Sequence, residues 1–218
     1  MIKKKICAVC GKECEVFHDD VEKAYISKLK DGAKLYYELW HFDVERCFGC
    51  NYASKDISKC LPVKVDEKEK LRILKDETLE LLYQTRPHYV YNYLLAALYY
   101  KTIGDTFTQS LCVLQAGDWL YHEIMNYMDY ILDDTDKVER EKLNNYAYGY
   151  YQQAIELIKS YLESNPQDLN AKLLLAGVLS DCEKTEKIQS SIILRSLQKE
   201  NLTADQKKIL EFLYSDIE

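Results

Sequence analysis

Two stretches near the start of the chain repeat one pattern of cysteines. Residues 7–12 read CAVCGK and residues 47–52 read CFGCNY. Each Cys-x-x-Cys has the spacing of a metal-binding knuckle, and two knuckles together supply the four thiolates of one tetrahedral site. The residue after each pair, Gly11 or Asn51, enters left-handed backbone space at low cost, as the turn of a knuckle requires. We therefore expect one zinc ion, bound by Cys7, Cys10, Cys47 and Cys50.

The role of the metal follows from the number of ligands. Four protein ligands leave no open coordination position, so we expect a structural ion. Iron in the same four-thiolate cage is the chemical competitor, and the spacing does not separate the two metals. Reduced thiols without metal and redox-active dithiols are the other interpretations, but a thioredoxin-like dithiol requires a βαβ context that is not visible. Cys14 and Cys60 are alternative ligands, although a buried strand position for Cys14 and a junction position for Cys60 are simpler expectations.

No catalytic motif emerges from the remaining sequence. His122-Glu123 begins like a zinc-protease helix, but Asn126 replaces the second histidine, so the two-imidazole clamp is absent. A glycine-rich phosphate loop and a Gly-x-Ser-x-Gly elbow are also missing. We expect that the protein is not an enzyme.

The composition indicates a helical protein of the cytoplasm. Seven Gly and three Pro are few for 218 residues, and 47% hydrophobic with 30% charged residues is ordinary for a globular chain. No apolar run approaches the roughly 20 residues that cross a bilayer, and Lys3–Lys5 are not followed by the apolar segment of a signal peptide. In the cytoplasm thiols stay reduced, and paired cysteines bind metal more often than they form disulfides.

The periodicity divides the chain near residue 62. Residues 1–62 are expected to form a small β-rich module, with strands at Cys14–His18 and Lys34–Val44, that needs a metal to be stable. Residues 63–218 show the three- and four-residue apolar spacing of helices. The predicted helices span residues 66–84, 88–103, 108–132, a segment ending near 164, 169–182, 184–197 and 203–214. The fold class is therefore mainly α, with a zinc-ribbon-like module before an antiparallel helical array.

Some of these helices resemble the tetratricopeptide repeat (TPR) pattern. The positions that carry the resemblance are Tyr93, Ala97, Tyr100, Gly104 and Ala116 in one unit, and Ala154, Ile158 and Pro166 in another. Tyr161 departs from the pattern, because a small residue is typical at its position. The resemblance implies pairs of antiparallel helices stacked into a concave surface.

The whole layout resembles an uncharacterised bacterial family that joins an N-terminal zinc-ribbon-like module to a C-terminal TPR-like domain. The matching stretches are residues 7–12, 47–53, 86–87 and 91–97. The chain departs from the usual pattern at Ala8, where Pro is common, and at Asn51, where Gly is common. The resemblance implies an architecture and no biochemical activity.

A protein-interaction scaffold is the leading functional hypothesis. The 19 tyrosines are suited to a surface that binds a protein or peptide partner, because each offers a rigid ring with a polar tip. Helix periodicity selects Asn92, Tyr93, Tyr100, Tyr148 and Tyr151 as candidate partner-binding residues. Ordinary packing between helices is the alternative role of each tyrosine.

Nucleic-acid binding through the N-terminal module is the second hypothesis. It is motivated by the cations Lys3, Lys4, Lys5 and Lys12 and by the aromatic residues Tyr36, Tyr37 and Trp40. The net charge of −7 opposes it, since an acidic body repels phosphate.

Overall fold

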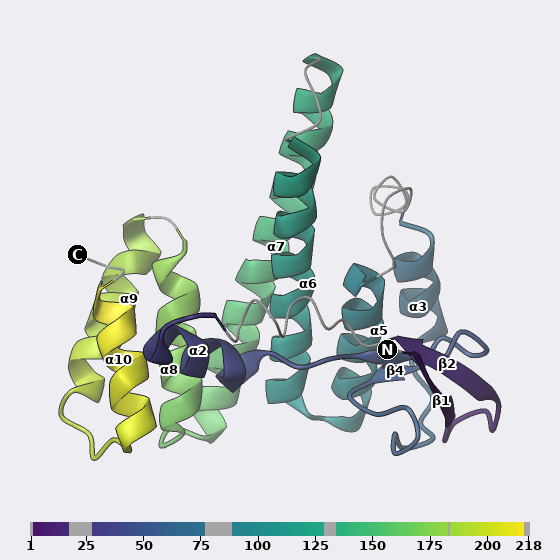
Figure 1. Cartoon of the computed structure of the whole chain (residues 1–218), viewed down its shortest axis with the longest axis horizontal. Coiled ribbons are helices and arrows are strands. Elements are labelled where there is room, and N and C mark those ends of the chain that lie inside the picture. Colours follow the sequence, from purple (N-terminus) through teal and green to yellow (C-terminus); the bar gives the residue numbers. More distant parts are fainter. Residues whose placement is uncertain (1, 18–27, 77–88, 129–133, 183, 216–218) are drawn as a thin grey trace. The chain divides into compact units, whose positions relative to one another are not determined.

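The computed structural model describes residues 2–17, 28–76, 89–128, 134–182 and 184–215 (Figure 1). The protein is mainly helical, with a small β-stranded part at its N-terminus, as the sequence predicts. None of the described helices is both long enough and apolar enough to cross a membrane.

The chain forms two compact units that interleave along the sequence. The first unit comprises Met1–His18 and Asp43–Ala154, and the second comprises Asp19–Phe42 and Ile155–Glu218. The boundary expected at residue 62 lies within the first unit, and part of the segment between the two cysteine pairs, Asp19–Phe42, belongs to the second. Independent folding of residues 1–62 stays a prediction.

Two short hairpins open the first unit. Strand β1 (Ile2–Ile6) pairs antiparallel with β2 (Glu13–Phe17), with Lys5 opposite Cys14. Strand β3 (Glu45–Arg46) pairs antiparallel with β4 (Ala53–Ser54). The strand predicted at Cys14–His18 is therefore confirmed within the described residues. A small apolar cluster joins the hairpins and contains Cys7, Cys14, Val16, Cys47 and Ile57.

Helices form most of the rest of the first unit. They are α3 (Glu67–Leu74), α5 (Tyr89–Ile103), α6 (Thr106–Met128) and the first part of α7 (Asp134–Ser164). Asp66 caps α3 by accepting hydrogen bonds from the amides of Lys68 and Glu69. The helix ends at Leu74, earlier than predicted, and residues 77–84 of that prediction lie outside the described residues.

Helix α5 is the centre of the first unit. It is apolar on all sides, and most of its residues are buried against α3, α6 and β4. It ends as predicted at Gly104, whose φ of 78° allows the amide of Asp105 to reach the carbonyl of Tyr100 at 3.0 Å. Two α5 hydroxyls accept hydrogen bonds from the N-terminal part of the unit: Tyr99 from the Leu61 amide and Tyr100 from the Lys55 amide.

The second unit is built around another buried helix, α8 (Leu169–Ser180). Helices α2 (Asp31–Trp40), α9 (Lys184–Leu197) and α10 (Ala204–Ser215) pack with it (Figure 1). Asp168 caps α8, and Thr203 and Gln206 exchange hydrogen bonds at the start of α10, as the predicted threonine cap implies.

The strand predicted at Lys34–Val44 is wrong, because Asp31–Trp40 is a helix. Its aromatic residues suggested β structure, but Tyr36 and Trp40 are one helical turn apart and both are buried. Tyr36 packs against Phe212 of α10, with ring centroids 6.0 Å apart, and fills the space that a side chain at Gly177 of α8 would occupy. Tertiary packing therefore overrides local propensity here.

Candidate metal centre

The first cysteine pair sits in the turn of the β1–β2 hairpin. The amide of Gly11 donates to the carbonyl of Cys7 at 2.9 Å, and the amide of Cys7 donates to the carbonyl of Lys12 at 3.0 Å. Gly11 has a φ of 71°, in the left-handed region. The chain is thereby turned so that Cys10 comes back beside Cys7.

The second cysteine pair repeats this backbone in the β3–β4 turn. The amide of Asn51 donates to the carbonyl of Cys47 at 2.7 Å, and the amide of Cys47 donates to the carbonyl of Tyr52 at 2.8 Å. Asn51 has a φ of 61° and is the one non-glycine residue with positive φ among the residues that the structure describes. The left-handed conformation predicted at positions 11 and 51 is confirmed.

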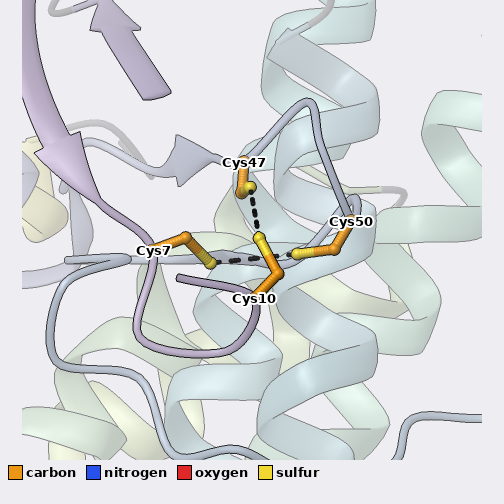
Figure 2. Close-up of side chains that lie close together, drawn as sticks. All are labelled: Cys7, Cys10, Cys47 and Cys50. Atoms are coloured by element: carbon orange, nitrogen blue, oxygen red, sulfur yellow. Dashed lines mark hydrogen bonds between the residues drawn. The ribbon is translucent and has the colours of Figure 1, made fainter. Parts of the chain in front are cut away.

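The four sulfurs converge, as Figure 2 shows. All lie within 4.8 Å of one another, with Cys7 and Cys50 at 3.8 Å and Cys10 and Cys47 at 3.6 Å. A tetrahedral ion with metal–sulfur bonds of about 2.3 Å has edges of about 3.8 Å. All eight cysteines of the chain are free, so no disulfide competes for these sulfurs. The four cysteines could therefore hold a metal ion.

Burial and backbone amides shift the pKa of the first cysteine in each knuckle, Cys7 or Cys47. Cys7 and Cys47 are fully buried, whereas Cys10 is exposed. Burial raises the pKa of Cys7, against hydrogen bonds from the amides of Cys10 and Val9. Burial also opposes ionisation of Cys47, but hydrogen bonds from the Cys14 thiol and from the amides of Cys50 and Gly49 lower its pKa to about 6. Both knuckles thus direct amide hydrogens at their first sulfur, which favours the thiolate form that a metal needs.

The two alternative ligands differ in position. Cys14 is buried, as expected, and its Sγ donates to Cys47 Sγ at 3.0 Å. Cys60 is equally buried, but its Sγ donates to the carbonyl of Ile57. Neither belongs to the group of four mutually close ligand atoms.

An ion pair joins the two knuckles and was not predicted. Lys5, two residues before Cys7, donates to both carboxylate oxygens of Glu45, two residues before Cys47, at 2.7 and 3.0 Å. Glu45 is only 2% exposed and also accepts from the amide of Ile57. Asp56 accepts from Lys5 at 2.9 Å. The equivalent placement of Lys5 and Glu45 before the two cysteine pairs was a signal that the sequence contained.

A second contact supports the turn at Asn51. The side-chain oxygen of Asn51 accepts hydrogen bonds from Arg46, at 3.2 Å from Nε and 2.7 Å from Nη2. The guanidinium also lies 5.0 Å from the ring centroid of Phe48, which is exposed. Arg46 therefore holds both the turn residue and the tip of the second knuckle.

The five candidate partner-binding residues are placed differently by the structure. Tyr93 and Tyr100 are 3% and 8% exposed and lie inside the first unit. Asn92 is partly buried, and Tyr151, also partly buried, donates to Asp118 at 3.3 Å. Tyr148 is 41% exposed. Of these residues, Tyr148 offers the most surface to a partner.

Sequence reasoning missed Tyr121, which is 45% exposed on α6. Helices α6 and α7 run side by side (Figure 1), and Tyr151 of α7 bonds to Asp118 of α6. Tyr121 lies one turn after Asp118 on α6, and Tyr148 lies one turn before Tyr151 on α7. In an antiparallel pair these two positions lie at the same level. The helix pair therefore carries two exposed tyrosines at one level along its length.

Several residues of the nucleic-acid hypothesis are paired or buried within the fold. Lys4 pairs with Glu13 at 3.1 Å, and Lys5 pairs with Glu45 and Asp56. Tyr36 and Trp40 are buried within the second unit. Nucleic-acid binding stays a prediction, with fewer available cations and stacking rings than the sequence suggested.

No match is found among protein-family models, curated proteins or solved structures. The resemblance to a zinc-ribbon and TPR-like family therefore stays a prediction, and the function must be inferred from the site itself.

Proposed function

We propose that Cys7, Cys10, Cys47 and Cys50 bind one structural zinc ion and that the protein is a non-catalytic scaffold for a protein or peptide partner. The observation that carries the metal assignment is the sulfur geometry, with two separations of 3.8 and 3.6 Å that match the edge of a tetrahedral thiolate site. When bound, zinc supplies a tetrahedral cross-link between two chain segments.

The hairpins explain why such a cross-link is needed. The strands β3 and β4 have two residues each, and the apolar cluster between the hairpins is small and contains ligand cysteines. An element of this size buries too little apolar surface to be stable alone, and structural zinc contributes about 10 kcal/mol or more in small zinc modules. Four thiolates also fill the coordination sphere, which supports a structural role.

Metal analysis tests this part of the proposal. Purified protein is expected to contain about one zinc per chain. Iron would be recognised by elemental analysis and by the strong visible absorption of ferric thiolates. The metal is expected to be lost on treatment with a chelator, together with amide-exchange protection in β1 and β2. A metal-free protein with fully protected hairpins would contradict the proposal.

The scaffold role is supported by the exposed tyrosines of the α6–α7 pair. Tyr121 and Tyr148 are 45% and 41% exposed, and rings of this kind bury a large area at small entropic cost when a partner binds. The helix pair would form part of a TPR-like surface. The partner is therefore expected to contact α6 and α7.

A comparison of two variants tests the scaffold role. Tagged wild-type protein, Tyr121→Ala/Tyr148→Ala and the control Ile192→Ala are used to capture partners from cells. Ile192 is 62% exposed on α9 in the second unit, so its replacement removes exposed apolar surface elsewhere. The expected result is a partner captured by wild type and control and lost from the double variant. Equal capture by all three proteins would contradict the α6–α7 assignment.

A further inference from the structure

A fifth thiol lies against the candidate metal centre. Cys14 is on β2, where Glu13 and Glu15 are exposed and Cys14 and Val16 are buried. This alternation is that of a strand with one face in the core, and it directs Cys14 toward the ligand cysteines. Its Sγ is 3.0 Å from Cys47 Sγ, closer than the 3.6 Å between the ligands Cys10 and Cys47.

We propose that Cys14 is a reserve ligand, so that the centre has two four-thiolate sets. Cys7, Cys10 and Cys50 belong to both sets, and the fourth position is taken by Cys47 or by Cys14. This inference rests on the proposed metal binding and deepens it. Rotation of a cysteine side chain between staggered rotamers moves its sulfur by about 3 Å. Cys14 can therefore cover the distance to the position of Cys47 without a change of backbone.

The exchange is balanced in atoms and charge. The Cys14 thiol already donates its hydrogen to Cys47 Sγ. As the Cys14 sulfur binds the metal, its proton passes to the Cys47 sulfur, which leaves as a thiol. One metal–sulfur bond forms, one breaks, and no electron is transferred. The result is that the centre keeps four thiolates when Cys47 departs.

The geometry makes the two knuckles unequal. Cys47 has the reserve thiol beside it, whereas Cys10 is exposed at the tip of its turn, with Cys47, itself a ligand, as its close sulfur neighbour at 3.6 Å. Loss of Cys47 is therefore compensated by Cys14, and loss of Cys10 is not.

Cobalt(II) added to the full chain tests the inference, because its thiolate charge-transfer and ligand-field bands report the number of bound sulfurs. Wild type and Cys47→Ala are expected to show four-thiolate spectra with one metal per chain. Cys10→Ala is expected to show three. Cys47→Ala/Cys14→Ala is expected to lose one thiolate and to bind about tenfold more weakly than Cys47→Ala. The matched control is Cys47→Ala/Cys60→Ala, which removes an equally buried thiol and is expected to behave like Cys47→Ala.

A second measurement leaves all four principal ligands in place. Zinc-loaded Cys14→Ala is expected to release zinc to a chelator about tenfold faster than wild type, since Cys14 can no longer recapture the metal. Cys60→Ala is expected to release it at the wild-type rate. These rates test the inference even if the Cys47 variants do not fold.

The outcomes separate the two proposals. A wild-type chain that binds neither cobalt nor zinc would contradict the metal centre itself. A wild type with four thiolates, combined with a three-thiolate Cys47→Ala, would overturn the reserve ligand alone. Equal zinc release from Cys14→Ala and wild type would also overturn it.

Discussion

The two knuckles reach the same backbone geometry from different residues. In the first, Gly11 adopts a φ of 71° with nothing within 4 Å of the place where a side chain would be. In the second, Asn51 adopts a φ of 61° and its side chain is held by Arg46. The first turn depends on the conformational freedom of glycine, and the second depends on hydrogen bonds of a larger residue. The two turns therefore share one backbone conformation although the residue that adopts it differs.

The neighbours of the knuckles differ as well. Both knuckles bury their first sulfur, but Cys47 has the Cys14 thiol at 3.0 Å; the last sulfur is exposed in the first knuckle (Cys10) and partly buried in the second (Cys50). Lys5 and Glu45 join the two across the centre. This comparison suggests experiments that separate what each knuckle requires.

The largest effect is expected from Cys7→Ser, because Cys7 belongs to both ligand sets. Loss of metal binding removes most of the roughly 10 kcal/mol that a structural zinc contributes. Residues 2–17 and 43–60 are expected to lose amide protection in hydrogen exchange, as in chelated wild type. Helix α2, which lies between the cysteine pairs in sequence, packs with α8 and α10 and is expected to stay protected.

Cys60→Ala serves as the control for Cys7→Ser, since it removes a buried thiol that bonds to the Ile57 carbonyl. It is expected to keep both the metal and the protection of β1. Full protection of β1 in Cys7→Ser would show that the hairpins do not need the metal.

A smaller effect is expected from Glu45→Gln, which removes the ion pair of Lys5 with Glu45 and leaves its ion pair with Asp56 in place. Removing one partner of a buried ion pair costs about 3 kcal/mol. The control is Lys4→Ala on β1, the strand of Lys5; its pair with Glu13 is exposed to water (side chains 64% and 63% exposed), so its loss is expected to leave the stability almost unchanged. Urea unfolding of the metal-loaded proteins measures both. Equal effects would mean that the link between the knuckles adds no stability.

The turn residues are expected to have effects of about 1 kcal/mol. Gly11→Ala must place a side chain at positive φ, which costs about 1–2 kcal/mol, although space is available. Asn51→Gly relieves that strain but loses the bonds from Arg46, so its net effect is expected to be below about 1 kcal/mol. Both changes are measured by thermal unfolding of the metal-loaded protein.

Gly149→Ala is the control for the turn residues. Gly149 lies within α7 and also has open space around it, so alanine is expected to stabilise by about 0.5–1 kcal/mol. Destabilisation by Gly149→Ala equal to that of Gly11→Ala would show that backbone conformation is not the cause.

The smallest effect is expected from Asp56 at acid pH. A hydrogen bond from Ser58, followed by bonds from Lys5 and Lys59, lowers the pKa of Asp56 below its ordinary value, against partial burial. A carboxyl with a lowered pKa contributes stability above its unfolded pKa of about 3.9 and loses it as the pH falls further. Asp56→Asn is therefore expected to be less stable than wild type near neutral pH and to flatten the loss of stability below about pH 4. An unchanged acid limb in urea titrations would contradict this role.

The knuckles were predictable from sequence because their determinants are local. Cys7 and Cys10, or Cys47 and Cys50, lie within one turn, and the need for positive φ at the next residue restricts that position to few residue types. The bounds of α9 were predicted for the same reason, since apolar spacing and capping act over one or two turns.

Contacts between distant residues were not predictable in this way. The sequence contains Lys5, Glu45, Cys14 and Cys47, but nothing local states that Lys5 meets Glu45 or that Cys14 meets Cys47. The aromatic residues of 34–44 favoured a strand by propensity, and only the helices α8 and α10 beside them explain the helix that forms.

The sequence by itself determined the four candidate ligands, the two left-handed turn residues and the mainly helical class. Spacing and backbone preference act within a few residues, so these features do not depend on the rest of the fold. The tertiary structure decided that α2 belongs to the second unit, that Tyr93 and Tyr100 are buried, and that a fifth thiol lies beside Cys47. Each of these results depends on which distant segments pack together, because burial and contact are properties of the assembled core.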